Sequence, residues 1–362
     1  MKTGILVVNL GTPDSNEEKD VARYLREFLM DGRVIDIPAW KRWLLVNLII
    51  APFRAKKVSK EYKKLWLKEG SPLLVYGQRF ADKLEKLYDS DDVKVALAMR
   101  YQNPSINKGL EELRAFGAQQ IIVFPMFPQY ASATTGSVAE KVMRITSTWN
   151  VIPSIHFVNS YHKDPAYINV FVEKVKTDME KYQPDHVLFS YHGLPERQLG
   201  KANEGKAVYC KFPACDCRKE NGKNPYCYRN ACFETSKLIA KESGLSDEQF
   251  TTSFQSRLGK SPWIQPYTDD KIAEIRKLGV KNLLVVSPSF VADCLETTLE
   301  IGEQYRDLFL ELGGESFNYT TSLNDQDQWI KAVQQIIEAH TGFINHPVTH
   351  DETLQIDRAA VR

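Results

Sequence analysis

The chain has 362 residues, of which 43% are hydrophobic and 11% aromatic, a composition typical of a folded globular protein. At this length two domains of ordinary size are expected. Its 47 basic and 46 acidic side chains leave a net charge of +1, which argues against a nucleic-acid partner, and no apolar run approaches the length needed to span a bilayer.

Short β-rich apolar runs alternate with longer amphipathic stretches, and this alternation predicts parallel sheets with crossover helices, an α/β fold. In the first half, residues 1–150, we expect strands at 5–10, 93–99 and 120–125 and helices at 17–30, 74–88 and 106–116. In the second half, 151–341, we expect strands at 154–158, 186–191, 250–255 and 282–288 and helices at 166–182, 230–242 and 268–278, with closing helices at 300–312 and 326–340. The final segment, 342–362, lacks periodicity, so we expect a disordered tail.

The tetrapeptide His192-Gly193-Leu194-Pro195 ends one of the predicted strands of the second half. Open α/β sheets usually bind ligands at the carboxyl ends of their strands. Histidine can accept a proton near neutral pH, and its neutral ring can bind iron. His192 is therefore a candidate catalytic residue, although a lone histidine at a strand end is more often hydrogen-bonded to a loop.

Three carboxylates, Asp293, Glu296 and Glu300, follow the predicted strand at 282–288. Spacings of three and four residues would bring them near one helical face if a helix starts there. Such a line could carry protons away or bring a divalent metal in. The alternative is a solvated acidic face at a helix start, where the helix dipole favours carboxylates.

An apolar run at Trp40–Phe53 is followed by the cations Arg54, Lys56 and Lys57. The run is too short to span a membrane, but aromatic and basic flanks are typical of segments that rest in the membrane interface. We expect weak peripheral membrane contact through this segment. A buried core helix is the alternative.

Five cysteines gather within 23 residues, beginning 18 residues after His192: Cys210, Cys215, Cys217, Cys227 and Cys232. The opening apolar run at 4–10 is too short for a signal peptide, so we expect a cytoplasmic protein with reduced thiols. Clustered reduced cysteines are typical of metal sites, but these lack the Cys-x2-Cys pairs of most structural zinc sites. Four thiolates ligate a [2Fe-2S] cluster with looser spacing. Zinc and unligated thiols remain alternatives.

Several peptides at the predicted strand ends, taken together over about 3–340, resemble ferrochelatases. They are Asn9-Leu10-Gly11-Thr12-Pro13, Tyr24-Leu25-Arg26-Glu27-Phe28-Leu29, Gly70-Ser71-Pro72-Leu73, Met99-Arg100-Tyr101, Phe127-Pro128-Gln129-Tyr130, Thr134-Thr135-Gly136-Ser137, Ser190 to Pro195, Gln255-Ser256-Arg257-Leu258-Gly259, Pro262-Trp263 and Asp293-Cys294-Leu295-Glu296-Thr297. Each peptide alone is weak, but their order along the chain is that of the family.

The resemblance implies two Rossmann-like domains with an active-site cleft between them, and insertion of Fe(II) into protoporphyrin IX to give protohaem. It implies that His192 and Glu296 are catalytic and meet the iron, with Asp293 and Glu300 as further metal candidates. Arg100 and Tyr101 resemble the family's pair that lines the metal side of the pocket, and Ile35 falls at its apolar porphyrin-facing position. Tyr130 and Trp263 would add aromatic surface for porphyrin binding, although either of them taken alone is more often an ordinary core residue. The segment at 34–66 matches the family's hydrophobic lip. A [2Fe-2S] cluster held by internal cysteines occurs in some members, and the insertion at 203–232 would supply four of the five here.

One departure is Cys294, which stands where mitochondrial members have a histidine, although Asp-Cys-Leu-Glu-Thr is similar to many bacterial members. We assign Cys294 to packing. Related chelatases, acting on coproporphyrin III or placing cobalt in a sirohydrochlorin, are alternatives that the long apolar lip disfavours. A non-catalytic Fe–S or haem carrier, with His192 as axial ligand, is disfavoured by the carboxylates near Glu296.

Overall fold

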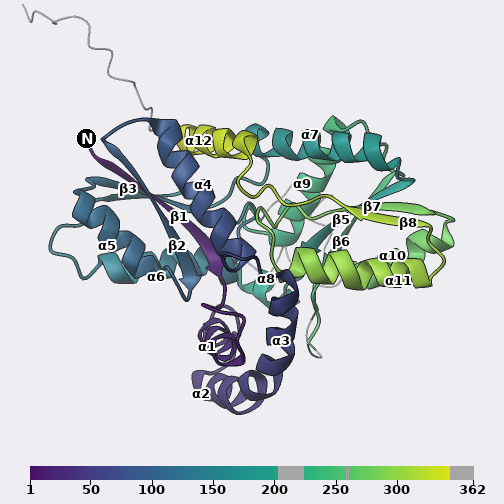
Figure 1. The fold of residues 1–362 in the computed structure, drawn as a ribbon, viewed down its shortest axis with the longest axis horizontal. Coiled ribbons are helices and arrows are strands. Elements are labelled where there is room, and N and C mark those ends of the chain that lie inside the picture. Colours follow the sequence, from purple (N-terminus) through teal and green to yellow (C-terminus); the bar gives the residue numbers. More distant parts are fainter. Residues whose placement is uncertain (203–223, 258, 260, 343–362) are drawn as a thin grey trace, which may run out of the picture.

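The computed structural model of the protein describes residues 1–202, 224–257, 259 and 261–342. Two four-stranded sheets, each wholly parallel and flanked by helices, lie in the two halves of the chain (Figure 1). The α/β fold with two similar halves expected from the sequence is therefore confirmed.

The first sheet has the strand order β2-β1-β3-β4. Its central strand β1 is an apolar run that is buried almost throughout, as expected for a parallel strand covered on both faces. The strands of this sheet are β1 (Thr3–Gly11), β2 (Val93–Tyr101), β3 (Gln120–Pro125) and β4 (Ser154–Phe157). Its helices are α4 (Pro72–Tyr88), α5 (Ile106–Phe116) and α6 (Ser137–Thr146), and the short π-helix η2 (Ser132–Gly136) leads into α6.

The second sheet repeats this topology with the order β6-β5-β7-β8. Its strands are β5 (His186–His192), β6 (Phe250–Gln255), β7 (Asn282–Val286) and β8 (Ser316–Tyr319). Its helices are α7 (Pro165–Tyr182), α8 (Glu196–Ala202), α9 (Tyr228–Glu242), α10 (Thr268–Lys277), the π-helix η3 (Glu296–Tyr305) and α11 (Arg306–Glu311). Because β5 lies between β6 and β7, the carboxyl ends of these three strands meet at one edge of the sheet.

One strand differs from the sequence expectation. The strand at 154–158 was assigned to the second half, but β4 pairs in register with β3, for example Ile121 with Ile155, and forms the edge of the first sheet. Its residues are at most half-buried, which is typical of an edge strand with one neighbour. The strand β8 was not expected at all, because it is four residues long and no residue in it is fully buried.

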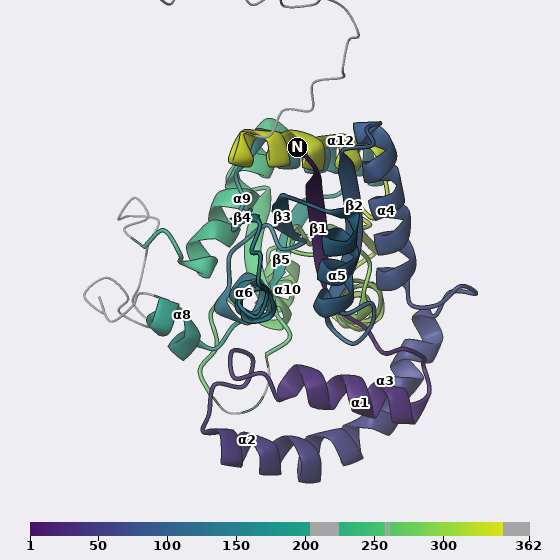
Figure 2. The same ribbon diagram turned by 90° about the vertical axis from the view of Figure 1, so that its left-hand side faces the viewer.

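The lip, 34–66, projects below the body of the molecule and consists of α2 (Ala39–Leu44), the π-helix η1 (Leu45–Ile50) and α3 (Ala51–Leu65), with α1 (Glu18–Leu29) packed against α3 (Figure 2). Its base joins the other half, since Val58 and Tyr62, together with Val21 of α1, pack with Leu299 of η3. Its outer face exposes six large apolar side chains, by 42–79%: Trp40, Trp43, Leu44, Leu48, Ile49 and Phe53. The lip is therefore not the buried core helix that the sequence left as an alternative.

The two halves share one core. A single cluster of buried side chains runs from Ile5 of β1 through Val187 of β5, and the last helix, α12 (Asp327–Thr341), packs against both α4 and α7. Trp329 of α12 is fully buried, with its ring 6.3 Å from that of Phe80 and 6.1 Å from that of Tyr167. This shared core holds the ends of the two sheets in a fixed relation.

Candidate active site

His192 is the last residue of β5, at the sheet edge where parallel α/β folds usually bind ligands. Its Nδ1 lies 2.7 Å from the carbonyl oxygen of Gly193. A carbonyl can only accept, so the neutral ring keeps its proton on Nδ1 and leaves the Nε2 lone pair for another partner. The hydroxyl of Tyr228 donates to the backbone carbonyl of His192 over 2.9 Å and holds the strand end in place.

Aromatic rings and tight backbone packing surround His192. The rings of Trp263 and Phe290 lie 6.4 and 6.5 Å from the imidazole, centroid to centroid. A Cβ on Gly193 would lie 2.9 Å from the carbonyl oxygen of Gln255 and 3.2 Å from the Trp263 ring. Only glycine fits at this position, which gives a physical reason for the glycine after the histidine.

Glu296 begins the π-helix η3, four helical residues before Glu300. Burial raises the pKa of the Tyr24 and Tyr62 hydroxyls, and the charge of Glu296 raises both further. Burial raises the pKa of the Cys294 thiol well above its usual range, and the charge of Glu296 raises it further. The Cys294 thiol therefore stays protonated at neutral pH, and its assignment to packing stays a prediction.

The helix does not begin at Asp293: η3 starts at Glu296 and holds both Glu296 and Glu300, so Asp293 does not share a helical face with these two residues. Asp293 accepts from the Asn324 side chain (2.7 Å), beyond β8. Glu300 accepts from Gln255 (3.0 Å) at the end of β6, and from Ser256 and Tyr305. Among the described residues, no group of three or more His, Cys, Asp or Glu side chains is arranged to hold a metal ion.

Arg100 and Tyr101, at the end of β2, belong to a polar network centred on Asp31. One carboxylate oxygen of Asp31 accepts from Arg100 (2.6 Å), Tyr101 (2.9 Å) and Ser137. Burial by itself would raise the pKa of Asp31, but the hydrogen bonds from Ser137 and the Arg33 amide, with the Arg100 charge, lower it overall. Tyr101 is fully buried, so it has no surface for a ligand and supports Arg100 within the Asp31 network.

The sequence did not single out Asp31 or Ser137 as site residues. Ser137 lies in one of the motifs that carried the family resemblance, which was a usable signal. The only local signal at Asp31 is that an acidic residue follows a helix, and nothing nearby in the sequence distinguishes such a residue from an ordinary solvent-exposed one.

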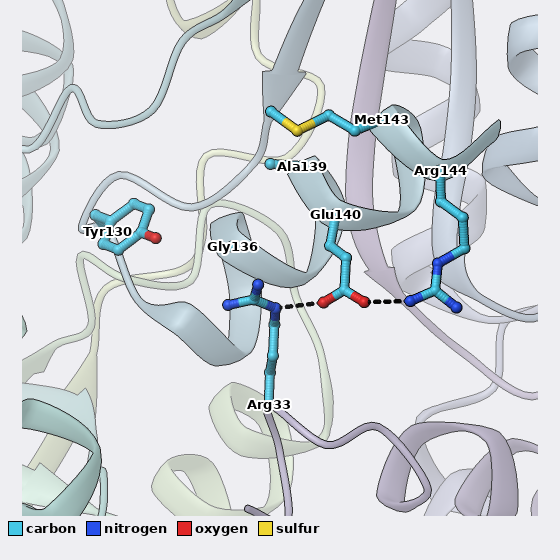
Figure 3. A pocket seen from close by; sticks show the side chains of 7 residues that line it. All are labelled: Arg33, Tyr130, Gly136, Ala139, Glu140, Met143 and Arg144. Atoms are coloured by element: carbon cyan, nitrogen blue, oxygen red, sulfur yellow. Dashed lines mark hydrogen bonds and ion pairs between the residues drawn. The ribbon is translucent and has the colours of Figure 1, made fainter. Parts of the chain in front are cut away.

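Tyr130 and Arg33 line an open cavity of about 480 Å³, and Ile35 follows Arg33 in the loop before α2. Figure 3 shows that Arg33, from the loop before α2, and Arg144, from α6, both reach Glu140. The hydrogen bond from Arg33 is the main cause of the lowered pKa of Glu140. The cavity is lined by Arg33, Tyr130, Gly136, Ala139, Glu140, Met143 and Arg144.

Of the five clustered cysteines, Cys210, Cys215 and Cys217 lie outside the described residues. Cys227 directly precedes α9 and is buried. Cys232 lies one turn into α9 with no exposed surface, and burial raises the pKa of its thiol well above the usual range. Both side chains belong to the same buried cluster, and they differ in position, since Cys227 precedes the helix and Cys232 lies within it.

Comparison with known proteins bears on the whole chain. Residues 2–341 match the family model for ferrochelatase. The chain is 45% identical over 339 residues to the ferrochelatase of Legionella pneumophila (strain Lens), covering 93% of this chain and 99% of that protein. It is 43% identical over 339 residues to the ferrochelatase of Coxiella burnetii (strain Dugway 5J108-111), covering 92% and 93%. The chain belongs to the ferrochelatase family.

The ferrochelatase fold of this chain is shared with more distant proteins of known structure. SirB from Bacillus subtilis with Fe3+ superposes with a TM-score of 0.52 at 13% identity, covering 94% of this chain and 97% of that one. The sirohydrochlorin chelatase SirB from Bacillus subtilis subspecies spizizenii, in complex with cobalt, gives 0.51 at 13% identity and covers 94% and 96%. At this identity the likeness concerns the fold alone.

Proposed function

We propose that this ferrochelatase inserts ferrous iron into protoporphyrin IX and that His192 is its central residue. Metallation removes two pyrrole N–H protons from the macrocycle and places one Fe(II) ion among its four nitrogens. The observation that carries the assignment is the contact between Nδ1 of His192 and the Gly193 carbonyl, which leaves Nε2 as a lone-pair donor at the strand end. A fixed lone pair can accept a pyrrole proton at neutral pH.

Glu296 is proposed as the second proton acceptor. It opens η3 in the segment that follows β7, and Phe290 of the same segment lies against His192. A carboxylate here can take up a proton or meet the incoming Fe(II) substrate through oxygen. Asp293 and Glu300 stay proposals as further metal contacts, and each would have to exchange its present donors, Asn324 and Gln255, for the ion.

The porphyrin wall is proposed to include Ile35, Arg100, Tyr130 and Trp263, with buried Tyr101 supporting Arg100. A planar macrocycle prefers apolar and aromatic neighbours with a few polar groups that orient it. The half-buried rings of Tyr130 and Trp263 suit this role, because each still has surface to offer a ligand. The ring of Trp263 beside the imidazole of His192 supports this arrangement.

The test is an anaerobic absorbance assay of the purified protein with Fe(II) and either protoporphyrin IX or coproporphyrin III. We expect haem formation with protoporphyrin, loss of turnover in His192→Ala, and a strong decrease in Glu296→Gln. Porphyrin binding, followed by fluorescence, should survive in both variants. Preference for coproporphyrin would keep the chemistry and change the substrate, whereas no metallation of either porphyrin by the unaltered protein would refute the proposal.

The lip is proposed to rest on a membrane surface and receive the poorly soluble porphyrin there. The exposed side chains of Trp43, Leu44 and Ile49 support this, and exposed cations such as Lys56 follow them in α3. Within the described part of the chain, no helix has the length and apolar character to cross a bilayer. We therefore propose peripheral contact.

Co-sedimentation with anionic liposomes tests the lip. Replacing Trp43, Leu44 and Ile49 by serine should abolish binding, whereas serine at Leu278, an even more exposed apolar residue after α10, should leave it unchanged. Liposome binding that survives the triple change would contradict the proposal.

A [2Fe-2S] cluster is proposed for the cysteine-rich insertion, with Cys210, Cys215, Cys217 and Cys227 as ligands and Cys232 as the spare thiol. The choice between the last two rests on their positions: Cys227 precedes α9, whereas Cys232 lies inside the helix with no exposed surface. Iron and sulfide analysis with visible absorption tests this independently of turnover. Cys232→Ser should keep near-equal iron and sulfide, and Cys227→Ser should lose both; tight zinc without sulfide in the unaltered protein would contradict the cluster.

A further inference from the structure

Asp36 lies near the start of the lip, in the loop between α1 and α2, and it is bound by a helix of the other half. Its carboxylate accepts from Arg197 at 2.7 Å and from Lys201 at 2.7 Å, both on α8. The Asp36 side chain is only 8% exposed although it lies in a surface loop. Burial would raise its pKa, but the hydrogen bonds and charges of Arg197 and Lys201 lower it overall, so the carboxylate stays ionised.

Gln198, between these two cations on α8, forms hydrogen bonds with the backbone of the same loop. Its amide nitrogen donates to the carbonyl oxygens of Arg33 (3.4 Å) and Val34 (3.1 Å). Ile35, the proposed porphyrin contact, lies between these carbonyls and Asp36. The loop around Ile35 is thus attached to α8 through both side-chain and backbone groups.

The helix α8 is in turn fixed relative to His192. Only three residues separate His192 from Glu196, where α8 begins. The intervening segment is tied down by hydrogen bonds from Gly193 to Gln255 and from Glu196 to Pro262, of 2.9 and 3.0 Å. A movement of the Asp36 loop away from α8 would therefore change the spacing between Ile35 and His192.

We propose that the contact of Asp36 with Arg197 and Lys201, which we name the lip latch, sets the spacing between Ile35 in the porphyrin wall and the base His192. The latch opens when porphyrin enters or haem leaves. The three side chains are positioning residues, since they act through the loop and α8. The part of the inference that concerns porphyrin entry and haem release rests on the proposed function. The latch itself rests only on the contacts described above.

Electrostatics make the latch suited to repeated opening. Arg197 is 41% and Lys201 64% exposed, so water can solvate both cations when they separate from Asp36. Partly exposed ion pairs are weakened by salt. The latch should therefore loosen as ionic strength rises.

The first test is hydrogen exchange of the ligand-free protein. In Asp36→Asn the backbone amides of 33–50 should exchange about tenfold faster, because loss of a hydrogen-bonded charge pair mainly speeds separation of the two surfaces. The matched control is Asp327→Asn, which removes an exposed ion pair to Lys83 that also joins the two halves, across α4 and α12. That control should leave exchange at 33–50 unchanged.

The second test is the dissociation rate of protoporphyrin IX, measured by stopped-flow fluorescence without iron. It should rise about tenfold in Asp36→Asn and equally in Arg197→Gln/Lys201→Gln, with no further rise when the changes are combined, because both remove one contact. High salt should speed dissociation from the unaltered protein and have little effect on the variants. If Asp36→Asn changes neither lip exchange nor dissociation while metallation proceeds, the latch is refuted and the proposed function stands. If lip exchange rises but the unaltered protein binds no porphyrin, the proposed function fails instead.

Discussion

Replacing Asp31 by asparagine removes the counter-charge of Arg100 while keeping the size of the side chain. Asp31 is 8% and Arg100 14% exposed, so the guanidinium is left in a largely dry site. Loss of one partner of a buried ion pair costs about 3 kcal/mol at the low end of the usual range. With an unfolding entropy of about 2.1 cal/mol/K per residue, this cost lowers the melting temperature by roughly 4 °C, if the chain unfolds as one unit.

Calorimetry or far-ultraviolet circular dichroism measures this change, and the pH dependence checks its cause. The lowered pKa of Asp31 means that its contribution to stability is fully present above its unfolded value of about 3.9 and is lost as the pH falls through the folded value. The difference between the unaltered protein and Asp31→Asn should therefore be constant from about pH 5 to 8 and shrink under more acidic conditions. Equal melting temperatures at pH 7, or a difference that grows in acid, would refute the reasoning.

Three further changes test the surroundings of His192. Gly193→Ala places a Cβ 2.9 Å from the Gln255 carbonyl, so we expect a cost of about 1–3 kcal/mol and a strong decrease in kcat, measured by melting and by the anaerobic assay. Tyr228→Phe removes the donor to the His192 carbonyl and should lower stability by about 1 kcal/mol with a smaller effect on kcat; an unchanged melting temperature would contradict the contact. Cys232→Val should fold and keep activity, because the raised pKa keeps the proton on the buried Cys232 thiol at neutral pH, so the thiol takes no part in proton transfer. An inactive but folded variant would contradict that view.

Much of the fold followed from the sequence because parallel strands buried on both faces are long apolar runs, as in β1 and β5. The edge strands were harder. β4 was assigned to the wrong sheet and β8 was missed, since short strands with one neighbour lack the buried pattern that marks central strands. Which sheet a strand joins depends on pairing across the chain, and no local pattern records it.

The candidate site was partly predictable for a similar reason. His192 and Glu296 could be proposed as site residues because each follows a predicted central strand within a recognisable peptide. The partners that hold the site were not found, because Asp31 and Asp36 act across 69 to 165 residues of sequence on Arg100 and on α8. The direction in which Asp293 and Glu300 point also depends on where η3 begins, and a π-helix has no simple sequence signature.

The position of α12 bears on how the chain reaches its native state during synthesis. The apolar surface of α4 around Phe80 belongs to the first half but is covered by Trp329, near the carboxyl end of the described chain. A ribosome releasing the chain from its amino terminus exposes that surface until almost all of the protein has emerged. We therefore expect nascent chains that lack α12 to need chaperone protection, and the first half expressed alone to aggregate.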